Sequence, residues 1–243
     1  MPKRPRVLIL RAAGTNCDVE TAHAFELAGA SAEAVHVNRL IGSPGTLDGF
    51  DLMAIPGGFS YGDDIAAGRI LAQRLTQRLA EPMRRFVEAG RPILGICNGF
   101  QVLLRAGLLG IEGGALTNNT TPRFVDEWVT LRRGPAASVW TRLLPDEHEV
   151  PIAHGEGRFV ASPEVLRQVE ADHLALSYAE NPNGSALDVA GLCDRTGLVL
   201  GLMPHPERHV DPTQHPAWTS RGDLPAEGPG LLMFRGAVEH AHG

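Results

Sequence analysis

Cysteine is scarce in this sequence, and the three present, Cys17, Cys97 and Cys193, stand far apart. They are too few and too scattered for the disulfide framework of a small secreted domain. No apolar run approaches the roughly 20 residues needed to cross a membrane. The opening stretch, MPKRPRVLIL, lacks the apolar core and cleavage site of a signal peptide. We therefore expect a cytoplasmic protein with no membrane partner.

An excess of positive charge is also missing. Lys and Arg total 22 against 28 Asp and Glu, which gives a net charge of −6. Nucleic-acid-binding proteins normally carry a basic stripe, so this balance argues against that class. We find no G-x-x-x-x-G-K-[ST] loop, the motif that cradles phosphates. The chain is therefore not expected to perform ATP-dependent synthesis itself, and we expect no cofactor in it.

What the sequence does contain is an alternation of apolar runs and helical segments in its first half. A continuous apolar run typical of a buried strand lies at 6–10, and further strands are predicted at 31–37, 51–56 and 92–96. Helices are predicted between or after them at 18–30, 67–89 (with a break at Pro82) and 99–107. Such alternation predicts an α/β fold, with a three-layer arrangement of a mostly parallel sheet flanked by helices.

After Gly110 the apolar runs become shorter and more frequent. Strands are predicted within 127–133, 149–160, 174–179, 185–194 and 197–204, with a helix at 162–171 and a hairpin turn at CDRTG, 193–197. A Pro/Gly-rich surface loop at 211–230 precedes a last helix at 231–242. We see no internal repeat and no dividing linker, so a single domain over residues 1–243 is predicted.

Four loops should share one edge of the predicted sheet. They contain AAGTNCD, PGGFSYGDD, CNG and PHPERH, and each follows a predicted strand. In open α/β sheets, ligands bind at the carboxyl ends of the strands. The sequence therefore places the candidate site at this edge.

The stretch GICNG puts a thiol at the corner between a strand and a helix. Gly95 and Gly99 lie two positions either side of Cys97, the pattern of a nucleophile elbow, in which larger flanking side chains would clash. A thiolate at a helix N-terminus is stabilised by the helix dipole, and the thiolate is the reactive form. The alternative is a buried structural cysteine, the common fate of a free thiol.

The other two cysteines have no such flanks. Cys17 is interpreted as a packing residue or a loop feature, and Cys193, beside the predicted hairpin turn, as a structural cysteine.

A histidine and a carboxylate follow the strand that ends near Pro204. Pro206 favours an extended conformation at His205, and residues two apart in an extended chain point to the same side. Glu207 can therefore orient the imidazole while its other nitrogen faces the thiol. A solvated His and Glu in a proline-rich loop is the alternative. A metal site at His205 and His209 is disfavoured because Pro206 opposes the helix that H-E-x-x-H requires.

Backbone N–H groups complete the predicted chemistry. The N–H of Asn98 follows the thiol, and Gly57-Gly58 allow a substrate oxygen to approach the backbone closely. In an acyl-transfer reaction at the thiol, these N–H groups would stabilise the negatively charged oxygen of the tetrahedral intermediate.

Three motifs in this order, PGGFSYGDD, GICNGFQ and MPHPER, resemble those of the class I (triad-type) glutamine amidotransferases, which have a flavodoxin-like fold. GTNCD, LTNNTTPRF, AHGEGRF and NPNGS are similar to signatures of one branch, the glutaminase subunits of phosphoribosylformylglycinamidine synthase. Together these segments span most of the chain. The loop at 211–230 looks longer than the corresponding connection in compact members.

The resemblance implies a role for each matching residue. Cys97 would be the nucleophile, His205 the acid/base and Glu207 the group that orients His205. Gly58 and Asn98 match the oxyanion-hole positions. Gln101 matches a residue that helps to hold the substrate glutamine, and AHGEGRF looks like part of the glutamine pocket.

The implied activity is hydrolysis of glutamine to glutamate and ammonia through a cysteine thioester. The ammonia would pass to a separate ATP-dependent synthetase subunit, which makes formylglycinamidine ribonucleotide in de novo purine biosynthesis. A small bridging subunit is a further implied partner, and ATP and Mg²⁺ are expected in the synthetase. The alternatives are an amidotransferase for another acceptor, a thiol peptidase of related fold, and an inactive amidotransferase-like regulatory protein.

Overall fold

One large sheet organises the molecule. The computed structural model describes residues 4–63, 68–121 and 123–243. Within them the sheet has the order β2 (Ser31–His36), β1 (Arg6–Arg11), β3 (Leu52–Ile55), β4 (Ile93–Ile96), β11 (Val199–Leu202), β10 (Val189–Cys193), β9 (Leu174–Tyr178), β6 (Val125–Arg133) and β7 (Glu147–His154). The first five strands pair in parallel and the remaining pairs are antiparallel. A small antiparallel sheet joins β5 (Ala115–Thr117) to β8 (Arg158–Val160).

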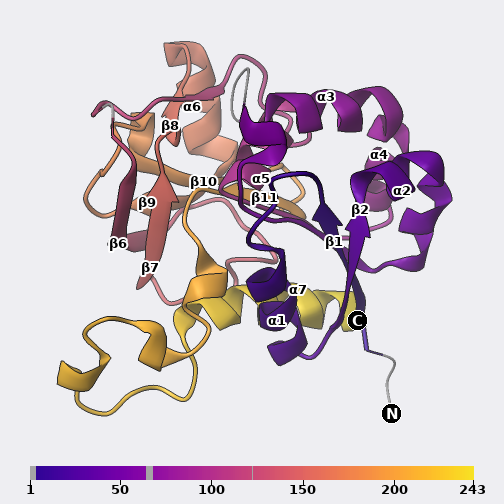
Figure 1. The fold of residues 1–243 in the computed structure, drawn as a ribbon. Coiled ribbons are helices and arrows are strands. Elements are labelled where there is room, and N and C mark those ends of the chain that lie inside the picture. Colours follow the sequence, from indigo (N-terminus) through magenta and orange to yellow (C-terminus); the bar gives the residue numbers. More distant parts are fainter. Residues whose placement is uncertain (1–3, 64–67, 122) are drawn as a thin grey trace.

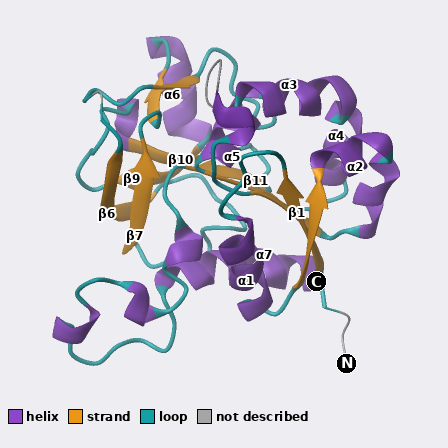
Figure 2. Ribbon diagram, viewed as in Figure 1, coloured by secondary structure: helices purple, strands orange, loops and turns teal. Residues whose placement is uncertain are grey.

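Helices cover both faces of the parallel strands. The described helices are α1 (Asp18–Leu27), α2 (Val37–Gly42), α3 (Arg69–Arg78), α4 (Ala80–Glu88), α5 (Asn98–Arg105), α6 (Pro163–Asp172) and α7 (Pro229–His242). In Figures 1 and 2, α1 and α7 lie together on one side of these strands, and α3, α4 and α5 lie on the other. Every residue of β3, β4 and β11 is buried, because helices shield both faces. The predicted three-layer α/β fold is confirmed.

A short connection makes β10 and β11 antiparallel neighbours in the sheet. The predicted turn after Cys193 is confirmed: β10 and β11 pair antiparallel, and the N–H of Gly197 donates to the carbonyl of Asp194. A connection this short cannot return a strand in parallel. As a result β11 lies beside β4 in parallel and beside β10 in antiparallel, and it joins the two halves of the sheet.

Some element boundaries differ from the predictions. The strand predicted at 149–160 is two strands, β7 and β8, separated at 155–157. The break in the first long helix lies at Leu79, and Pro82 stands in the first turn of α4, where a missing N–H costs no helical hydrogen bond. The predicted start of that helix, residue 67, lies outside the described residues. Helix α2 and strand β5 were not predicted.

The loop at 211–230 projects from the body of the molecule (lower left in Figure 1). It contains two short 3₁₀ turns, Pro212–Gln214 and Trp218–Ser220. Its His215 ring packs on Trp128 with centroids 4.4 Å apart, and Arg221 forms an ion pair with Glu149. The loop is therefore anchored to the antiparallel half of the sheet, through β6 and β7. The last helix begins at Pro229, two residues earlier than predicted.

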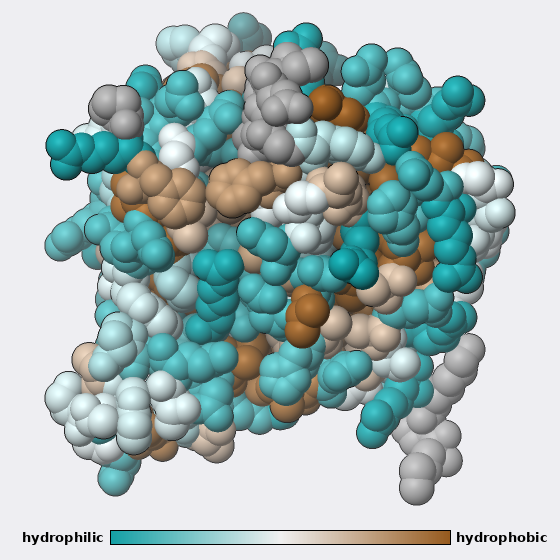
Figure 3. Space-filling view, in the orientation of Figure 1, coloured by the Kyte–Doolittle hydropathy of each residue, from teal (hydrophilic) through white to brown (hydrophobic). Residues whose placement is uncertain are grey.

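Among the described residues, no helix is both long and apolar enough to cross a bilayer. The face shown in Figure 3 is hydrophilic over most of its area, and its apolar patches are small and separated.

Candidate active site

Cys97 sits in a sharp turn between β4 and α5. Its backbone is left-handed, with φ 51° and ψ −105°, a conformation that costs about 1–3 kcal/mol for a residue with a side chain. A Cβ on Gly99 would lie 1.9 Å from the carbonyl oxygen of Ile55, and one on Gly95 would lie 2.6 Å from that of Gly99. Only glycine fits at either position. The geometry is that of the predicted elbow, and it presents the thiol at the start of a helix.

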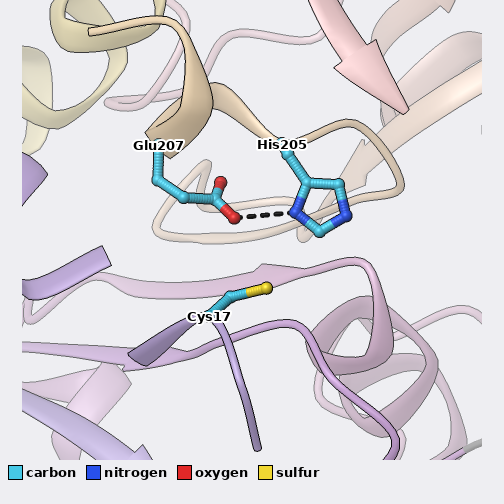
Figure 4. A group of neighbouring side chains, drawn as sticks. All are labelled: Cys17, His205 and Glu207. Atoms are coloured by element: carbon cyan, nitrogen blue, oxygen red, sulfur yellow. Dashed lines mark hydrogen bonds and ion pairs between the residues drawn. The ribbon is translucent and has the colours of Figure 1, made fainter. Parts of the chain in front are cut away.

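His205 and Glu207 form a buried pair after β11. The ring Nδ1 of His205 lies 2.7 Å from Oε1 of Glu207, and the side chains are 2% and 0% exposed (Figure 4). Burial alone would lower the pKa of His205. The charge of Glu207, together with hydrogen-bonding interactions from Cys17, Cys97 and Glu207 itself, raises that pKa well above its usual value. The carboxylate therefore favours a protonated imidazole and fixes which ring nitrogen faces away from it.

The thiol and the histidine converge beside Gly57. A Cβ added to Gly57 would lie 2.9 Å from Cε1 of His205, 3.1 Å from Sγ of Cys17 and 3.5 Å from Cβ of Cys97. In the described residues, Nε2 of His205 is buried and makes no well-formed hydrogen bond. Catalytic hydrogen bonds are often loose before substrate binds. The structure thus brings Cys97, His205 and Glu207 together around one glycine.

A cavity of about 670 Å³ opens at these residues. Its lining includes Cys97, His205, Gly58, Gln101 and the 153–156 segment. This size suits a small metabolite. Residues of all four predicted loops therefore line one cavity, with Asn16 and Cys17 contributed by the first loop, as the shared sheet edge predicts.

The two candidate oxyanion positions lie in the loops near the thiol: Gly58 lines the same cavity as Cys97, and Asn98 follows Cys97 in the chain. Gly58 has φ +145°, and a Cβ there would lie 2.5 Å from the carbonyl oxygen of Gly14, so no other residue fits. Asn98 is the first residue of α5, and helix N-termini favour negative charge. Its side chain accepts the N–H of Ser60 at 3.4 Å and donates to Oε1 of Gln101 at 2.9 Å. These contacts hold the Asn98 side chain between the loop that follows β3 and the next turn of α5.

Gln101 connects α5 to the AHGEGRF segment. Its Nε2 donates to the carbonyl oxygen of Glu156 at 2.5 Å. The thiol of Cys97 points toward the carbonyl oxygen of Ala153 at 3.7 Å. Burial, reinforced by the charge of His205, lowers the pKa of His154 to about 4, so His154 is neutral at pH 7. The end of β7 and the residues just after it therefore line the cavity together with Gln101 of α5.

The sequence placed Cys17 at the correct sheet edge but interpreted it as a packing residue or a loop feature. Its sulfur lies against the His205 ring, lines the cavity and accepts a hydrogen bond from Nη2 of Arg208 at 3.2 Å. The available signal was GTNCD, which is predicted at the same sheet edge.

Cys193 is fully buried in β10, as expected of a structural cysteine. His209 is not paired with His205 in one site, and its Nδ1 contacts the carbonyl oxygen of Glu149 at 2.6 Å.

Known proteins resemble this chain along nearly its whole length. Residues 4–241 match the family model for the CobB/CobQ-like glutamine amidotransferase domain. The phosphoribosylformylglycinamidine synthase subunit PurQ of Dehalococcoides mccartyi is 45% identical, with 97% of each chain covered. The same subunit of Methanococcus maripaludis is 37% identical, again over 97% of each chain.

The fold agrees with these sequence matches. A chain in the structure of PurLQS from Thermotoga maritima superposes with a TM-score of 0.79 at 31% identity, covering 98% of this chain and 99% of that one. The elbow and the buried His–Glu pair described above lie within the matched range. The chain therefore belongs to the CobB/CobQ-like glutamine amidotransferase family and, within it, to the branch of the PurQ subunits of phosphoribosylformylglycinamidine synthase.

Proposed function

We propose that this chain is the glutaminase subunit of a phosphoribosylformylglycinamidine synthase. It hydrolyses glutamine to glutamate and ammonia, and the ammonia serves formylglycinamidine ribonucleotide synthesis in de novo purine biosynthesis. The observation that carries the activity is the convergence of Cys97 with the His205–Glu207 pair in one cavity. The PurQ relatives, which match over 97% of the chain, support this branch of the family.

Cys97 is the proposed nucleophile. Its thiolate attacks the carboxamide carbon of glutamine, and the N–H groups of Gly58 and Asn98 stabilise the oxyanion of the tetrahedral intermediate. Protonated His205 donates a proton to the departing ammonia, which leaves a glutamyl thioester. His205 then takes a proton from water as the water attacks the thioester, and glutamate is released. Glu207 holds the imidazole in place through both steps.

Gln101 and the 153–156 segment form the proposed wall of the glutamine pocket. Gln101 is held by the carbonyl of Glu156 and the side chain of Asn98. Its amide is therefore fixed before substrate arrives, which lowers the entropy cost of binding. The role of Gln101 in holding glutamine is part of the proposal.

ATP and Mg²⁺ belong in this proposal to the partner. The sequence contains no phosphate-binding loop, so ammonia made at Cys97 must reach a separate ATP-dependent synthetase subunit, with a small bridging subunit as a further partner. The relative chain in the PurLQS structure supports an assembly of this kind. A cytoplasmic location completes the proposal, and the three unpaired thiols suit a reducing compartment.

The test is a comparison of glutamine with free ammonia as nitrogen source. The wild-type chain, mixed with its synthetase subunit, ATP and formylglycinamide ribonucleotide, should use both. Cys97→Ser should abolish glutamine use and leave the ammonia-dependent reaction intact, while Cys193→Ser should leave both intact. Loss of the ammonia reaction in Cys97→Ser would contradict the proposal.

The same assay separates the alternatives. An amidotransferase for another acceptor would release glutamate without stimulation by formylglycinamide ribonucleotide. An inactive regulator would keep its function after Cys97 is alkylated.

A further inference from the structure

The proposed reaction needs one sulfur, yet two lie at the histidine. Cys17, at the start of α1, is 1% exposed, and Figure 4 shows its sulfur facing the His205–Glu207 pair from the opposite loop. One donor atom from each of Cys17, His205 and Glu207 lies within 4.8 Å of the other two. The proposed hydrolysis of glutamine does not use Cys17. The reaction therefore does not explain why a second cysteine lies beside His205 and Glu207.

The three donors have the chemistry of a zinc site. A thiolate sulfur, an imidazole nitrogen and a carboxylate oxygen are the ligand types that Zn²⁺ takes in proteins. The sulfur disfavours Mg²⁺ and Ca²⁺, which prefer oxygen ligands. The thiolate and the carboxylate carry one negative charge each, which matches the charge of a divalent cation once the Arg208 guanidinium, now 3.2 Å from the Cys17 sulfur, turns away. Charge balance matters here because all three residues are buried.

The spacing of the donors is close to what the ion requires. The donor atoms lie within 4.8 Å of one another, and even a triangle with every side at that limit places its corners about 2.8 Å from the centre, whereas bonds to Zn²⁺ measure about 2.0–2.3 Å. Each donor must therefore move by less than about 1 Å. Rotation of the Cys17 side chain supplies part of this movement. A tetrahedral ion keeps its fourth position for water.

Two atoms of the cluster lack partners in the described part of the chain. Nε2 of His205 and Oε2 of Glu207 are buried without a hydrogen bond, and both residues are at most 2% exposed. Buried polar atoms normally have a partner. Nε2 is the ring nitrogen that faces away from Glu207 and serves the proposed reaction. An ion that bonds to Oε2 would give this buried carboxylate atom a partner, and Oε2 is the indication of a ligand that is independent of the cysteine.

From this cluster we propose that Cys17, His205 and Glu207 form a binding site for Zn²⁺ at which the metal inhibits the enzyme. Binding releases the proton of Cys17 and the proton of the imidazole, and the ion bonds to sulfur, nitrogen and oxygen. His205 is then unable to move protons for Cys97, and Glu207 no longer orients the imidazole. The predicted inhibition of glutamine use rests on the proposed function, whereas the predicted binding of Zn²⁺ does not. A chelator that removes the metal should reverse the binding and the inhibition.

The test is metal binding to the complete chain, measured without substrate. Calorimetry with Zn²⁺ should show one tight site in the wild type, in Cys193→Ser and in Cys97→Ser. Cys17→Ser and Cys17→Ala should weaken binding by at least about 100-fold, since loss of outer-shell contacts alone costs 10–100-fold. With Co²⁺ as the probe, the sulfur-to-metal charge-transfer band should persist in Cys97→Ser and vanish in Cys17→Ser. Circular dichroism checks that each variant is folded.

Three results would overturn the proposal. One is unchanged Zn²⁺ affinity in folded Cys17→Ser or Cys17→Ala. Another is loss of binding in Cys97→Ser, which would make the nucleophile the ligand. The third uses no variant: X-ray absorption of the wild-type Zn²⁺ complex should show one sulfur with nitrogen and oxygen neighbours, and two sulfurs or none would exclude this ligand set. None of these measurements uses glutamine. They would therefore still test the metal site if the chain proved not to hydrolyse glutamine.

Discussion

Cys97 and Cys17 are both buried sulfurs beside His205, yet their backbones differ. Cys97 is held in the left-handed conformation between two glycines that no other residue can replace. Cys17 has ordinary backbone geometry, with φ −101°, and its sulfur contacts Asn16 and Arg208. Stored strain is typical of functional positions, and it favours Cys97 as the nucleophile. Cys17 is then available for a separate role.

At the residue scale, the roles of His205 and Glu207 can be separated by mutation. His205→Ala should lower kcat for glutamine by about 10³-fold, within the range for loss of a general acid/base. Glu207→Ala should cost less, because it removes the group that orients the proton carrier and leaves the carrier itself. Steady-state glutamate release by the assembled complex measures both. The exposed Glu239→Ala is the control, and a larger loss in Glu207→Ala than in His205→Ala would refute the assignment.

At the scale of elements, the turn from β4 to α5 depends on Gly99. A methyl group there would meet backbone, the carbonyl of Ile55, and must displace either β3 or α5. Such overpacking costs about 1–3 kcal/mol, so Gly99→Ala should lower Tm by roughly 5 °C and abolish glutamine use. Differential scanning calorimetry and the glutaminase assay measure the two effects.

Gly42→Ala is the matched control for that experiment. A Cβ at Gly42 meets nothing within 4 Å, so stability and activity should stay close to wild type. Equal effects of the two substitutions would show that the close packing at Gly99 is not what holds the elbow.

At the scale of the whole molecule, two buried histidines should make stability depend on pH. Burial, with smaller contributions from neighbouring histidines, lowers the pKa of His148 and of His154 to about 4. Between that value and 6.5 the unfolded chain binds protons that the fold excludes, so the free energy of unfolding falls as pH falls through this window. Each group contributes up to about 3 kcal/mol.

Urea unfolding at pH 7 and pH 5 measures this dependence. His148→Phe should reduce the loss of stability on acidification by less than half relative to wild type, because the pKa values of His154, His209 and His215 are also lowered and these groups still titrate. His205 does not oppose the trend. Its pKa is raised, so the stability it contributes is fully present below pH 6.5 and is lost only as pH rises through its higher folded value. An unchanged slope in His148→Phe would contradict the prediction.

The loop at 211–230 leads to a prediction about assembly. Trp218 is 42% exposed on this projecting loop, and exposed tryptophans are enriched among residues that dominate binding. Trp218→Ala should weaken binding to the synthetase subunit by about tenfold without changing the Tm of the isolated chain. Surface plasmon resonance measures the affinity. Unchanged affinity after deletion of residues 214–225 would remove this role.

Local sequence determined the strands, most helices and the elbow. The apolar runs of β1, β3, β4 and β11 were recognisable because strands buried on both faces need apolar residues at every position. The spacing of Gly95, Cys97 and Gly99 indicated a tight turn. The clashes that exclude larger residues there involve only residues nearby in the chain and the adjacent strand β3. His205 and Glu207 were found for the same reason, since two residues in one extended stretch share a side.

Only the tertiary structure decided which distant groups meet. Cys17 and His205 are far apart in sequence, and no local pattern of either reveals that both pack on Gly57. The antiparallel half of the sheet, the division of 149–160 into β7 and β8, and the anchoring of His215 on Trp128 likewise depend on packing between remote segments. The periodicity of apolar residues along the sequence indicates which face of a helix or strand is buried. Which two elements then touch depends on how all the other elements fill the core.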